Sequence, residues 1–389
     1  YNTNVRILMI GGYKIIMKFV HIADIHFDSP FVNLADREGF GDIRRLDQRK
    51  ALKKVINYIK ENKIPYLFIS GDLYENQYIK KSTIEYINSL FGEIPDTQIF
   101  ISPGNHDPYL KNSYYNQYKW NKNVKIFGSK IEKVSMDDVD IYGFGFNDFY
   151  CNGCDIENLN IDNPEKLNIL VIHGTLNGAI LQEKNYNPIS ERVLRQKGFD
   201  YVALGHIHKT NYDIDAQFLS NNYGNFEKEK IIYPGSTVSM GFDELGKHGM
   251  VVGEIQKNGK CNLDFIQIDD KEFVEKQIDV TNILSKEELI EKINEQLILE
   301  NEFVKIILMG KRNFEIETYE LYKMIQNQRI IKIKDKTKIN FNLEQIANQN
   351  TLKGLFAKEI YEKMQLENIT EQEKEIMEKA VEVVFEALK

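Results

Sequence analysis

The chain has 389 residues, a formal net charge of −8 at pH 7, a hydrophobic fraction of 42% and a charged fraction of 28%. This composition is typical of a globular protein, and the length predicts two domains because one compact core rarely organises so many residues. The acidic balance excludes a polyanion binder held by overall charge, although a local basic strip or a metal centre could still contact nucleic acid. No apolar run in the sequence approaches the length that spans a bilayer.

The N-terminus and the cysteines bear on processing and compartment. Residues 1–16 lack the apolar core and the cleavage pattern of a signal peptide, so we expect a non-native or disordered extension before a natural start at Met17. Three cysteines in a long chain imply no disulfide framework and favour a reducing, cytoplasmic location. Cys151 and Cys154 have redox or zinc-ribbon spacing, but no second pair completes a zinc site, and we interpret them as loop cysteines.

The first part of the chain alternates strands and helices. An apolar run from Phe19 predicts a buried strand that ends in Asp24 and His26. Since strand residues two apart share a face, both side chains should leave the strand end in one direction. The next elements are expected over 44–62 (a helix with Leu46, Leu52, Val55, Ile56 and Ile59 at helical spacing), 66–70 (strand), 82–91 (helix) and 98–102 (strand). This alternation predicts a parallel α/β sheet with functional side chains at the C-terminal strand ends.

Polar residues follow these strands and two later ones. The turns carry Asp72 after strand 66–70, Asn105, His106 and Asp107 after strand 98–102, His173 after strand 167–172, and His206 and His208 after strand 201–204. Five of the seven histidines lie in such turns, whereas we interpret His21 and His248 as structural. The aromatic residues between Tyr109 and Trp120 could stack nucleobases, but we favour their packing against the domain.

These side chains predict a pair of divalent metal ions. Nitrogen and oxygen ligands without thiolate favour manganese, iron or zinc. Seven candidate ligands are too many for one tetrahedral ion but suit two ions that share a carboxylate, and Asp72 is the natural bridging group. The seven candidates are Asp24, His26, Asp72, Asn105, His173, His206 and His208.

Beyond about Asp270 the sequence becomes rich in lysine and glutamate and contains no further histidine. The expected elements there are helix 286–298, strand 303–309, helix 316–327 and strand 330–333, followed by helices. We therefore expect a first domain over 17–269, a small α/β domain over 270–340 and a helical region over 341–389. Alternate lysines in 331–338 fit either a cationic face along a phosphate backbone or a protected edge strand. Apolar stripes in the tail fit either an internal core or a surface for a partner helix.

Five short motifs occur in order along the chain. They are Asp-x-His at 24–26, Gly-Asp-x-x-Glu at 71–75, Gly-Asn-His-Asp at 104–107, a solitary histidine at 173 and Gly-His-x-His at 205–208. Together they resemble the calcineurin-like metallophosphoesterases over about residues 17–268. The resemblance implies an α/β fold of four layers, α/β/β/α, with a second, smaller α/β capping domain and a helical C-terminal tail.

The same resemblance implies roles for individual residues. One metal ion would be held by Asp24, His26, Asp72 and His208, and the second by Asp72, Asn105, His173 and His206. We expect Mn²⁺, with iron or zinc as alternatives. His106, held by Asp107, would protonate or stabilise the leaving oxygen in the hydrolysis of a phosphate ester.

A finer likeness is to the SbcD/YhaO-type DNA repair exonucleases. It rests on residues 21–30, 104–109, 233–236 and 241–244, and the region after Asp270 resembles their DNA-capping domain more weakly. It implies DNA and an SMC-like ATPase with a long coiled coil as partners, and it leaves a homodimer open. One departure bears on exonuclease activity. Double-strand-break nucleases often have histidine three residues after the bridging aspartate, where this chain has Glu75.

Three functions follow from these patterns. The first is a metal-dependent phosphodiesterase that acts on DNA ends as the nuclease subunit of a repair complex with the ATPase. The second is a phosphoesterase for nucleotides or phosphoprotein, which the acidic charge and Glu75 keep open. The third is a catalytically idle scaffold that docks DNA to the ATPase, and the complete ligand set argues against it because an idle protein is free to lose ligands.

Overall fold

The computed structural model describes residues 5–9, 12–31, 39–178, 185–212, 230–257, 261–366 and 368–388. The chain divides into two compact units, Tyr1–Phe273 and Val274–Lys389, and each is described by itself. The domain boundaries expected after residues 269 and 340 remain predictions. Within the described ranges, none of the helices combines the length and the apolar character needed to cross a membrane.

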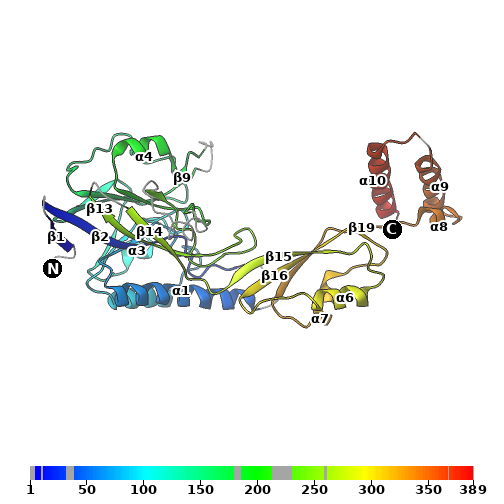
Figure 1. Cartoon of the computed structure of the whole chain (residues 1–389), viewed down its shortest axis with the longest axis horizontal. Helices are drawn as coiled ribbons and strands as arrows, with labels where there is room; N and C mark the ends of the chain where they lie inside the picture. The colour runs from blue at the N-terminus through cyan, green and yellow to red at the C-terminus, as the bar shows by residue number, and fades with distance from the viewer. Residues whose placement is uncertain are drawn as a thin grey trace. The chain divides into compact units, whose positions relative to one another are not determined.

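The first sheet of unit 1 is mixed and has seven strands. Figure 1 labels four of its strands, β1, β2, β13 and β14. Six follow the order β14-β13-β2-β3-β4-β5, and β1 pairs with β2. Their bounds are β1 (Val5–Met9), β2 (Gly12–Ile22), β3 (Tyr66–Ile69), β4 (Gln98–Ile101), β5 (Val124–Ile126), β13 (Gly249–Gln256) and β14 (Cys261–Gln267). Strands β2 to β5 run parallel, whereas β13 is antiparallel to both β2 and β14. Strand β1 is antiparallel to the start of β2, and the non-native origin of residues 1–16 stays a prediction.

The second sheet has five strands in the order β12-β11-β8-β7-β6. Their bounds are β6 (Glu132–Ser135), β7 (Val139–Phe144), β8 (Leu167–His173), β11 (Tyr201–Gly205) and β12 (Ile231–Ile232). All are parallel to their neighbours except β6, which is antiparallel to β7. A short parallel pair, β9 (Thr175–Leu176) and β10 (Pro188–Ile189), lies beyond β8. The predicted site residues lie in the loops after β2, β3, β4 and β11 and at His173, the last residue of β8.

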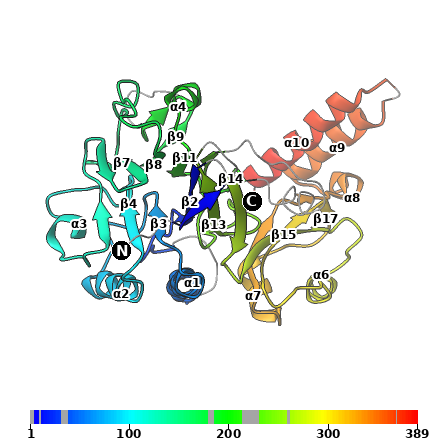
Figure 2. The ribbon, with the colours of Figure 1, turned by 60° about the vertical axis from the view of Figure 1, so that its left-hand side comes forward.

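Helices cover the outer faces of both sheets (Figure 2). The described helices of unit 1 are α1 (Phe40–Asn62), α2 (Lys81–Gly92), α3 (Tyr114–Gln117) and α4 (Glu191–Lys197). Val20 faces the core under α1 and α2, whereas the neighbouring Phe19 faces the core between the two sheets, because strand side chains alternate. Leu194 of α4 packs on the outer face of the second sheet. This four-layer α/β/β/α arrangement confirms the predicted fold class.

Helix α1 covers the sheet and also contacts the loop that follows β2. Leu46, which the helical spacing places on the buried face, is 52% exposed, whereas Arg44 and Gln48 are buried. The Gln48 amide donates to the backbone carbonyls of Ile25 at 2.8 Å and His26 at 2.7 Å. A helix residue of unit 1 therefore holds the loop that carries the first predicted site residues.

Unit 2 contains a three-stranded sheet in the order β15-β16-β18. Its elements are β15 (Glu272–Asp279), α6 (Lys286–Asn294), β16 (Glu302–Met309), β17 (Lys311–Arg312), α7 (Thr318–Met324), β18 (Ile330–Asp335) and β19 (Lys338–Ile339). Leu289 of α6 and Leu321 of α7 share one apolar core with Ile306 of β16. Strand β18 is an edge strand that buries Ile333 and exposes Lys334, so both interpretations of the lysines stay open.

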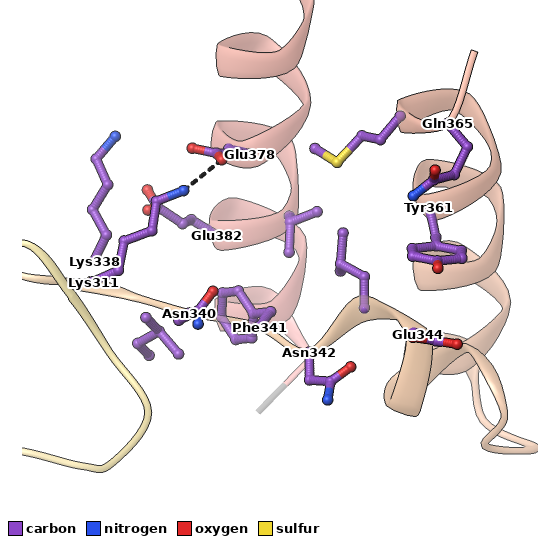
Figure 3. Close-up of a pocket in the computed structure, with 14 residues that line it drawn as sticks. Lys311, Lys338, Asn340, Phe341, Asn342, Glu344, Tyr361, Gln365, Glu378 and Glu382 are labelled. Carbon is purple, nitrogen blue, oxygen red and sulfur yellow. Dashed lines mark hydrogen bonds and ion pairs between the residues drawn. The ribbon is translucent and has the colours of Figure 1, made fainter. Parts of the chain in front are cut away.

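The C-terminal segment of unit 2 is helical, as predicted. It consists of α8 (Leu343–Ala347), α9 (Leu352–Met364) and α10 (Glu371–Ala387). Ala357 and Ile360 of α9 pack against Val381 of α10 in a small core. A cavity of about 320 Å³ lies between these helices and the β17–β19 pair, with Lys311 and Glu378 joined by a 2.6 Å ion pair on its wall (Figure 3).

His21 links burial to pH-dependent stability in unit 1. Its ring is fully buried, with Nδ1 2.9 Å from the Tyr201 hydroxyl and Nε2 3.0 Å from the Ser70 hydroxyl. Burial lowers the pKa of His21 to about 3, although a backbone hydrogen bond to Leu204 opposes the shift. The unfolded chain binds a proton below about pH 6.5 that the folded chain binds only near pH 3. The free energy of unfolding therefore falls as pH drops through this window.

We expect the variant His21→Gln to lose less stability on acidification than the wild type, because it removes one group that is protonated only in the unfolded chain. The slopes of unfolding free energy against pH should differ by up to about 1.4 kcal/mol per pH unit below pH 6.5. Urea unfolding from pH 7 to pH 5, followed by the fluorescence of Trp120, the single tryptophan, measures the difference. Parallel pH profiles of the two proteins would contradict this account.

Candidate metal centre

Asp24 and His26 lie in the loop after β2, which ends at Ile22. The strand alternation expected for them is therefore wrong, and a left-handed backbone turns them instead, with φ of 52° at Asp24 and 54° at His26. Hydrogen bonds hold this loop to the loop after β3, because the N–H of Asp24 donates to Gly71 O at 3.1 Å and that of His26 to Asp72 O at 2.9 Å. Asp72 has φ 52° as well. Such strained conformations in side-chain-bearing residues gather at functional sites.

The first group of donors consists of Asp24, His26 and His208. One ligand atom from each lies within 4.8 Å of the others. The Nε2 atoms of His26 and His208 are 3.1 Å apart. Asp24 and His26 are buried, and both oxygens of the Asp24 carboxylate accept from the backbone N–H of His206 at 3.1 Å.

The second group consists of Asp72, His173 and His206, again with one ligand atom from each within 4.8 Å of the others. Asn105 joins this group, since its Oδ1 lies 3.0 Å from His173 Nε2 and 3.2 Å from His206 Nδ1. Asp72 and His173 are buried, and Tyr186 lies against the His206 ring with centroids 5.0 Å apart. The group thus combines carboxylate, amide and imidazole donors.

Asp72 lies between the two groups. Its Oδ2 is 3.7 Å from His26 Nε2 and 3.4 Å from His173 Nε2, so a single oxygen faces both. Its Oδ1 accepts from the backbone N–H of His106 at 2.9 Å. Gly104 permits this packing, because a Cβ there would collide with the Asp72 carboxylate and come within 2.9 Å of the Asp72 nitrogen. All seven predicted ligands therefore converge, and their roles remain predictions.

The outer nitrogens of these histidines have their own acceptors. His26 Nδ1 lies 2.8 Å from Glu75 Oε1, His173 Nδ1 lies 2.8 Å from Ser70 O, and His208 Nδ1 bonds to Glu244. A ring whose Nδ1 donates a proton presents the Nε2 lone pair to the cluster when it is neutral. Lone pairs that face each other need positive charge between them, so these residues fit a pair of divalent cations with nitrogen and oxygen ligands.

The protonation of the buried cluster also fits cation binding. Burial raises the pKa of Asp24 to about 8, with His208 opposing and Asp72 adding to the effect. Burial lowers the pKa of His208, but the hydrogen bond to Glu244 and the charge of Asp24 raise it more, to about 9. For Asp72 burial raises the pKa, yet His173 and His26 hold it below its ordinary range. The cluster without metal therefore retains protons, which cation binding would release.

The His106 ring lies against His26 of the first group, with centroids 4.7 Å apart, and its side chain is 44% exposed. Its Nδ1 is 2.9 Å from Glu75 Oε2, which corrects the expectation that Asp107 holds it. The buried Asp107 carboxylate instead accepts from the N–H of Gly104 at 2.6 Å, from the N–H of Leu73 at 2.7 Å and from the Tyr115 hydroxyl at 2.6 Å. Because these backbone groups occupy its oxygens, Asp107 shapes the loops around Asp72.

The sequence of this site matches a known family. Residues 17–210 match the calcineurin-like phosphoesterases. These residues form a calcineurin-like phosphoesterase domain. The match covers β8 with His173 and the loops after β2, β3, β4 and β11, and so all seven converging donors.

Three relatives align with the phosphoesterase chain at low identity. YhaO of Bacillus subtilis (strain 168), an uncharacterized metallophosphoesterase, is 25% identical over 289 residues, 72% of this chain and 67% of that protein. One component of the nuclease SbcCD, from Staphylococcus saprophyticus, is 25% identical over 284 residues, 65% of this chain and 69% of that protein. The DNA double-strand break repair protein Mre11 of Methanococcus maripaludis is 26% identical over 375 residues, 89% of this chain and 91% of that protein.

Sequence reasoning missed two residues of the phosphoesterase site. Glu75 appeared as the end of a motif and as a departure from the histidine of double-strand-break nucleases, and Glu244 as part of a matching stretch, but neither was given a role in the site. Both hold histidines of the first group through Nδ1. His248 is structural, as interpreted, because its Nδ1 lies 2.8 Å from the Ser236 hydroxyl and its Nε2 2.9 Å from Glu244 O. The signal for Glu75 was its place at the end of the Gly-Asp-x-x-Glu motif.

A cavity of about 250 Å³ opens beside His106 in the phosphoesterase domain. Its lining residues are Glu75, Gln77, Asn105, His106, Phe149, Tyr150 and Tyr186. The neighbouring Cys151 and Cys154 are free thiols, and Cys151 N–H donates to Asn185 O at 2.7 Å. The cysteines therefore belong to the loop that shapes this cavity. The aromatic residues from Tyr109 to Trp120 pack against the first core, as favoured from the sequence.

Proposed function

We propose that the chain is a two-metal-dependent phosphodiesterase that acts on DNA ends, as the nuclease subunit of a repair complex with an SMC-like ATPase. The observation that carries the proposal is the single Asp72 oxygen that faces His26 at 3.7 Å and His173 at 3.4 Å, while the other Asp72 oxygen accepts from the backbone N–H of His106 at 2.9 Å. That arrangement is what two cations sharing one carboxylate require.

The seven predicted donors form two sets that share Asp72. Asp24, His26, Asp72 and His208 would hold one cation, and Asp72, Asn105, His173 and His206 the other. Bound divalent cations lower the pKa of water and neutralise phosphate oxygens, which is the chemistry that they supply here. Asp72 would belong to both sets, and the loop hydrogen bonds keep Asp24 and His26 in register with it.

His106 suits the role of a general acid. Glu75 anchors its Nδ1, which leaves Nε2 to give a proton to the leaving oxygen. Burial lowers the pKa of His106, but the hydrogen bond to Glu75 and the charge of Asp72 raise it more, to about 9. The hydrogen bond to Glu75 thus favours a protonated imidazole, the form that can give a proton to the leaving oxygen of a phosphate ester.

The cavity beside His106 supports a nucleotide-bearing substrate. Phe149, Tyr150 and Tyr186 present aromatic rings to this space, and nucleobases stack on such rings without sequence preference. The names of the relatives, a nuclease component and a double-strand break repair protein, support DNA as the polymer. Glu75, at a position where double-strand-break nucleases often have histidine, keeps a phosphoesterase for nucleotides or phosphoprotein as the second candidate.

The C-terminal helices support the ATPase partner. Leu352 and Leu355 of α9 are 66% and 69% exposed, and Ile376 and Val383 of α10 are 63% and 61% exposed. These apolar side chains lie outside the small core of Ala357, Ile360, Val381 and Phe385. Exposed apolar faces on a helix pair suit a partner helix that presents its own apolar face, as a coiled coil does. A homodimer is the alternative occupant.

The test compares three substrates for the full chain with Mn²⁺: end-labelled duplex DNA, single-stranded DNA and the chromogenic diester bis(p-nitrophenyl) phosphate. We expect turnover of all three that stops with EDTA and returns with Mn²⁺, and we expect the ATPase to increase cleavage of duplex ends. Cleavage of the diester without cleavage of either DNA would favour the small-substrate enzyme. Turnover of none of the three under any divalent metal would favour the idle scaffold.

A further inference from the structure

Glu75 lies between two histidines with different tasks. Its Oε1 is 2.8 Å from Nδ1 of His26, and its Oε2 is 2.9 Å from Nδ1 of His106. The two rings meet edge to face, with centroids 4.7 Å apart and planes at 85°. One carboxylate therefore orients both a predicted metal ligand and the predicted general acid.

The carboxylate itself is held in place. Its side chain is 15% exposed, and Glu75 N–H donates to Phe27 O at 3.0 Å, in the loop after β2. The next residue, Asn76, donates its N–H to His106 O at 2.9 Å. The carbonyl of Glu75 accepts from Ile79 N–H at 2.9 Å, which closes the turn. Glu75 thus joins the loop of His26 to the loop of His106 through both backbone and side chain.

We infer that Glu75 is a positioning residue that couples the first metal site to the general acid. By accepting both Nδ1–H groups, it presents Nε2 of His26 to the metal cluster and Nε2 of His106 to the substrate. Because both rings share the Glu75 carboxylate, a movement of one ring that shifts this carboxylate also changes the hydrogen bond to the other ring. Glu75 therefore has a task of its own in this chain. The kinetic part of this inference rests on the proposed phosphodiesterase function, and its binding part does not.

Glu244 provides a matched control. It also holds a histidine of the first group, because its carboxylate bonds to His208 Nδ1. Its other oxygen accepts from the Ser236 hydroxyl and from Met240 N–H, so it is tied to its own loop rather than to His106. Loss of either carboxylate should weaken metal binding by about tenfold, since acceptors behind metal-bound histidines contribute to affinity on that scale. Only loss of Glu75 should also disturb the acid.

The experiment uses the full chain as wild type, Glu75→Gln, Glu75→Asp and Glu244→Gln. Glutamine keeps the length but offers one acceptor oxygen, so one histidine loses its partner. Aspartate keeps the charge but is one methylene shorter and cannot span both rings. Calorimetric titration with Mn²⁺ gives affinity, turnover of bis(p-nitrophenyl) phosphate at saturating Mn²⁺ gives kcat, and ¹⁵N-histidine NMR of the metal-free protein gives the protonation of each Nδ1.

We expect Glu75→Gln to lower Mn²⁺ affinity about tenfold and kcat about 10²-fold. Glu244→Gln should lower Mn²⁺ affinity by a similar factor, but its loss of kcat should be several-fold smaller. Glu75→Asp should restore neither the Mn²⁺ affinity nor kcat to the level of the wild type. The NMR spectrum should lose the hydrogen-bonded Nδ1–H state of His26 or His106 in both Glu75 variants. Equal losses of kcat in Glu75→Gln and Glu244→Gln, or full rescue by Glu75→Asp, would overturn the inference.

If the wild type does not turn over the diester, the proposed function fails and the inference is decided without kinetics. Reduced Mn²⁺ affinity together with the changed Nδ1 state in Glu75→Gln then supports the positioning role. Unchanged affinity and unchanged Nδ1–H signals overturn it.

Discussion

Replacement of Asp72 by asparagine should lower Mn²⁺-dependent turnover of bis(p-nitrophenyl) phosphate by about 10³-fold or more, since each tenfold corresponds to about 1.4 kcal/mol and cation stabilisation of the transition state amounts to several kcal/mol. The reason is that Asp72 Oδ2 is the oxygen common to both donor groups. An amide at this position provides no negative charge to hold two cations close together. Calorimetric titration should show the loss of at least one of two bound Mn²⁺ ions.

The control for this variant is Asp269→Asn. Asp269 is 3% exposed and Asp72 is 1% exposed, so both are buried aspartates of unit 1. Asp269 accepts from Arg44 at 2.7 Å and from Ser239 N–H at 3.0 Å, and it is not among the seven predicted donors. Its variant should be less stable to urea yet bind Mn²⁺ as the wild type does. Retention of both Mn²⁺ ions and of turnover in Asp72→Asn would contradict the shared-carboxylate site.

Replacement of His106 by alanine should lower kcat on DNA by about 10² to 10⁴-fold, the range that general acid catalysis contributes. The loss should be smaller on bis(p-nitrophenyl) phosphate, because p-nitrophenolate leaves without a proton whereas a sugar alkoxide does not. The side chain is 44% exposed, so its removal should change the free energy of unfolding little. Parallel assays of both substrates at saturating Mn²⁺ measure the contrast.

Mn²⁺ titration of His106→Ala separates the acid from the ligands. His106 is not among the seven predicted donors, so two Mn²⁺ ions should still bind with nearly the affinity of the wild type. Equal losses of kcat on the two substrates, or the loss of a bound ion, would assign His106 to metal binding instead of proton transfer.

Much of the fold was predictable because periodicity reports burial directly. The strands predicted over 66–70 and 98–102 correspond to β3 and β4, and the helix over 82–91 to α2. Helix ends were less predictable. Helix α7 ends at Met324, before the predicted residue 327, because Ile325 adopts an extended backbone and is buried in the core of unit 2. The helical spacing of apolar residues continues through Ile325 in the sequence. Only the packing in the folded structure shows that the helix ends before it.

The sequence by itself determined that the seven predicted donors meet, because aspartate, asparagine and histidine after five strands leave few other ways to bring polar groups together in an α/β fold. The tertiary structure decided how they meet. Left-handed turns rather than strand alternation orient Asp24 and His26. Glu75 rather than Asp107 holds His106, because backbone N–H groups of neighbouring loops occupy the Asp107 carboxylate. Hydrogen-bond partners depend on distances between separate loops, which spacing along one chain does not encode.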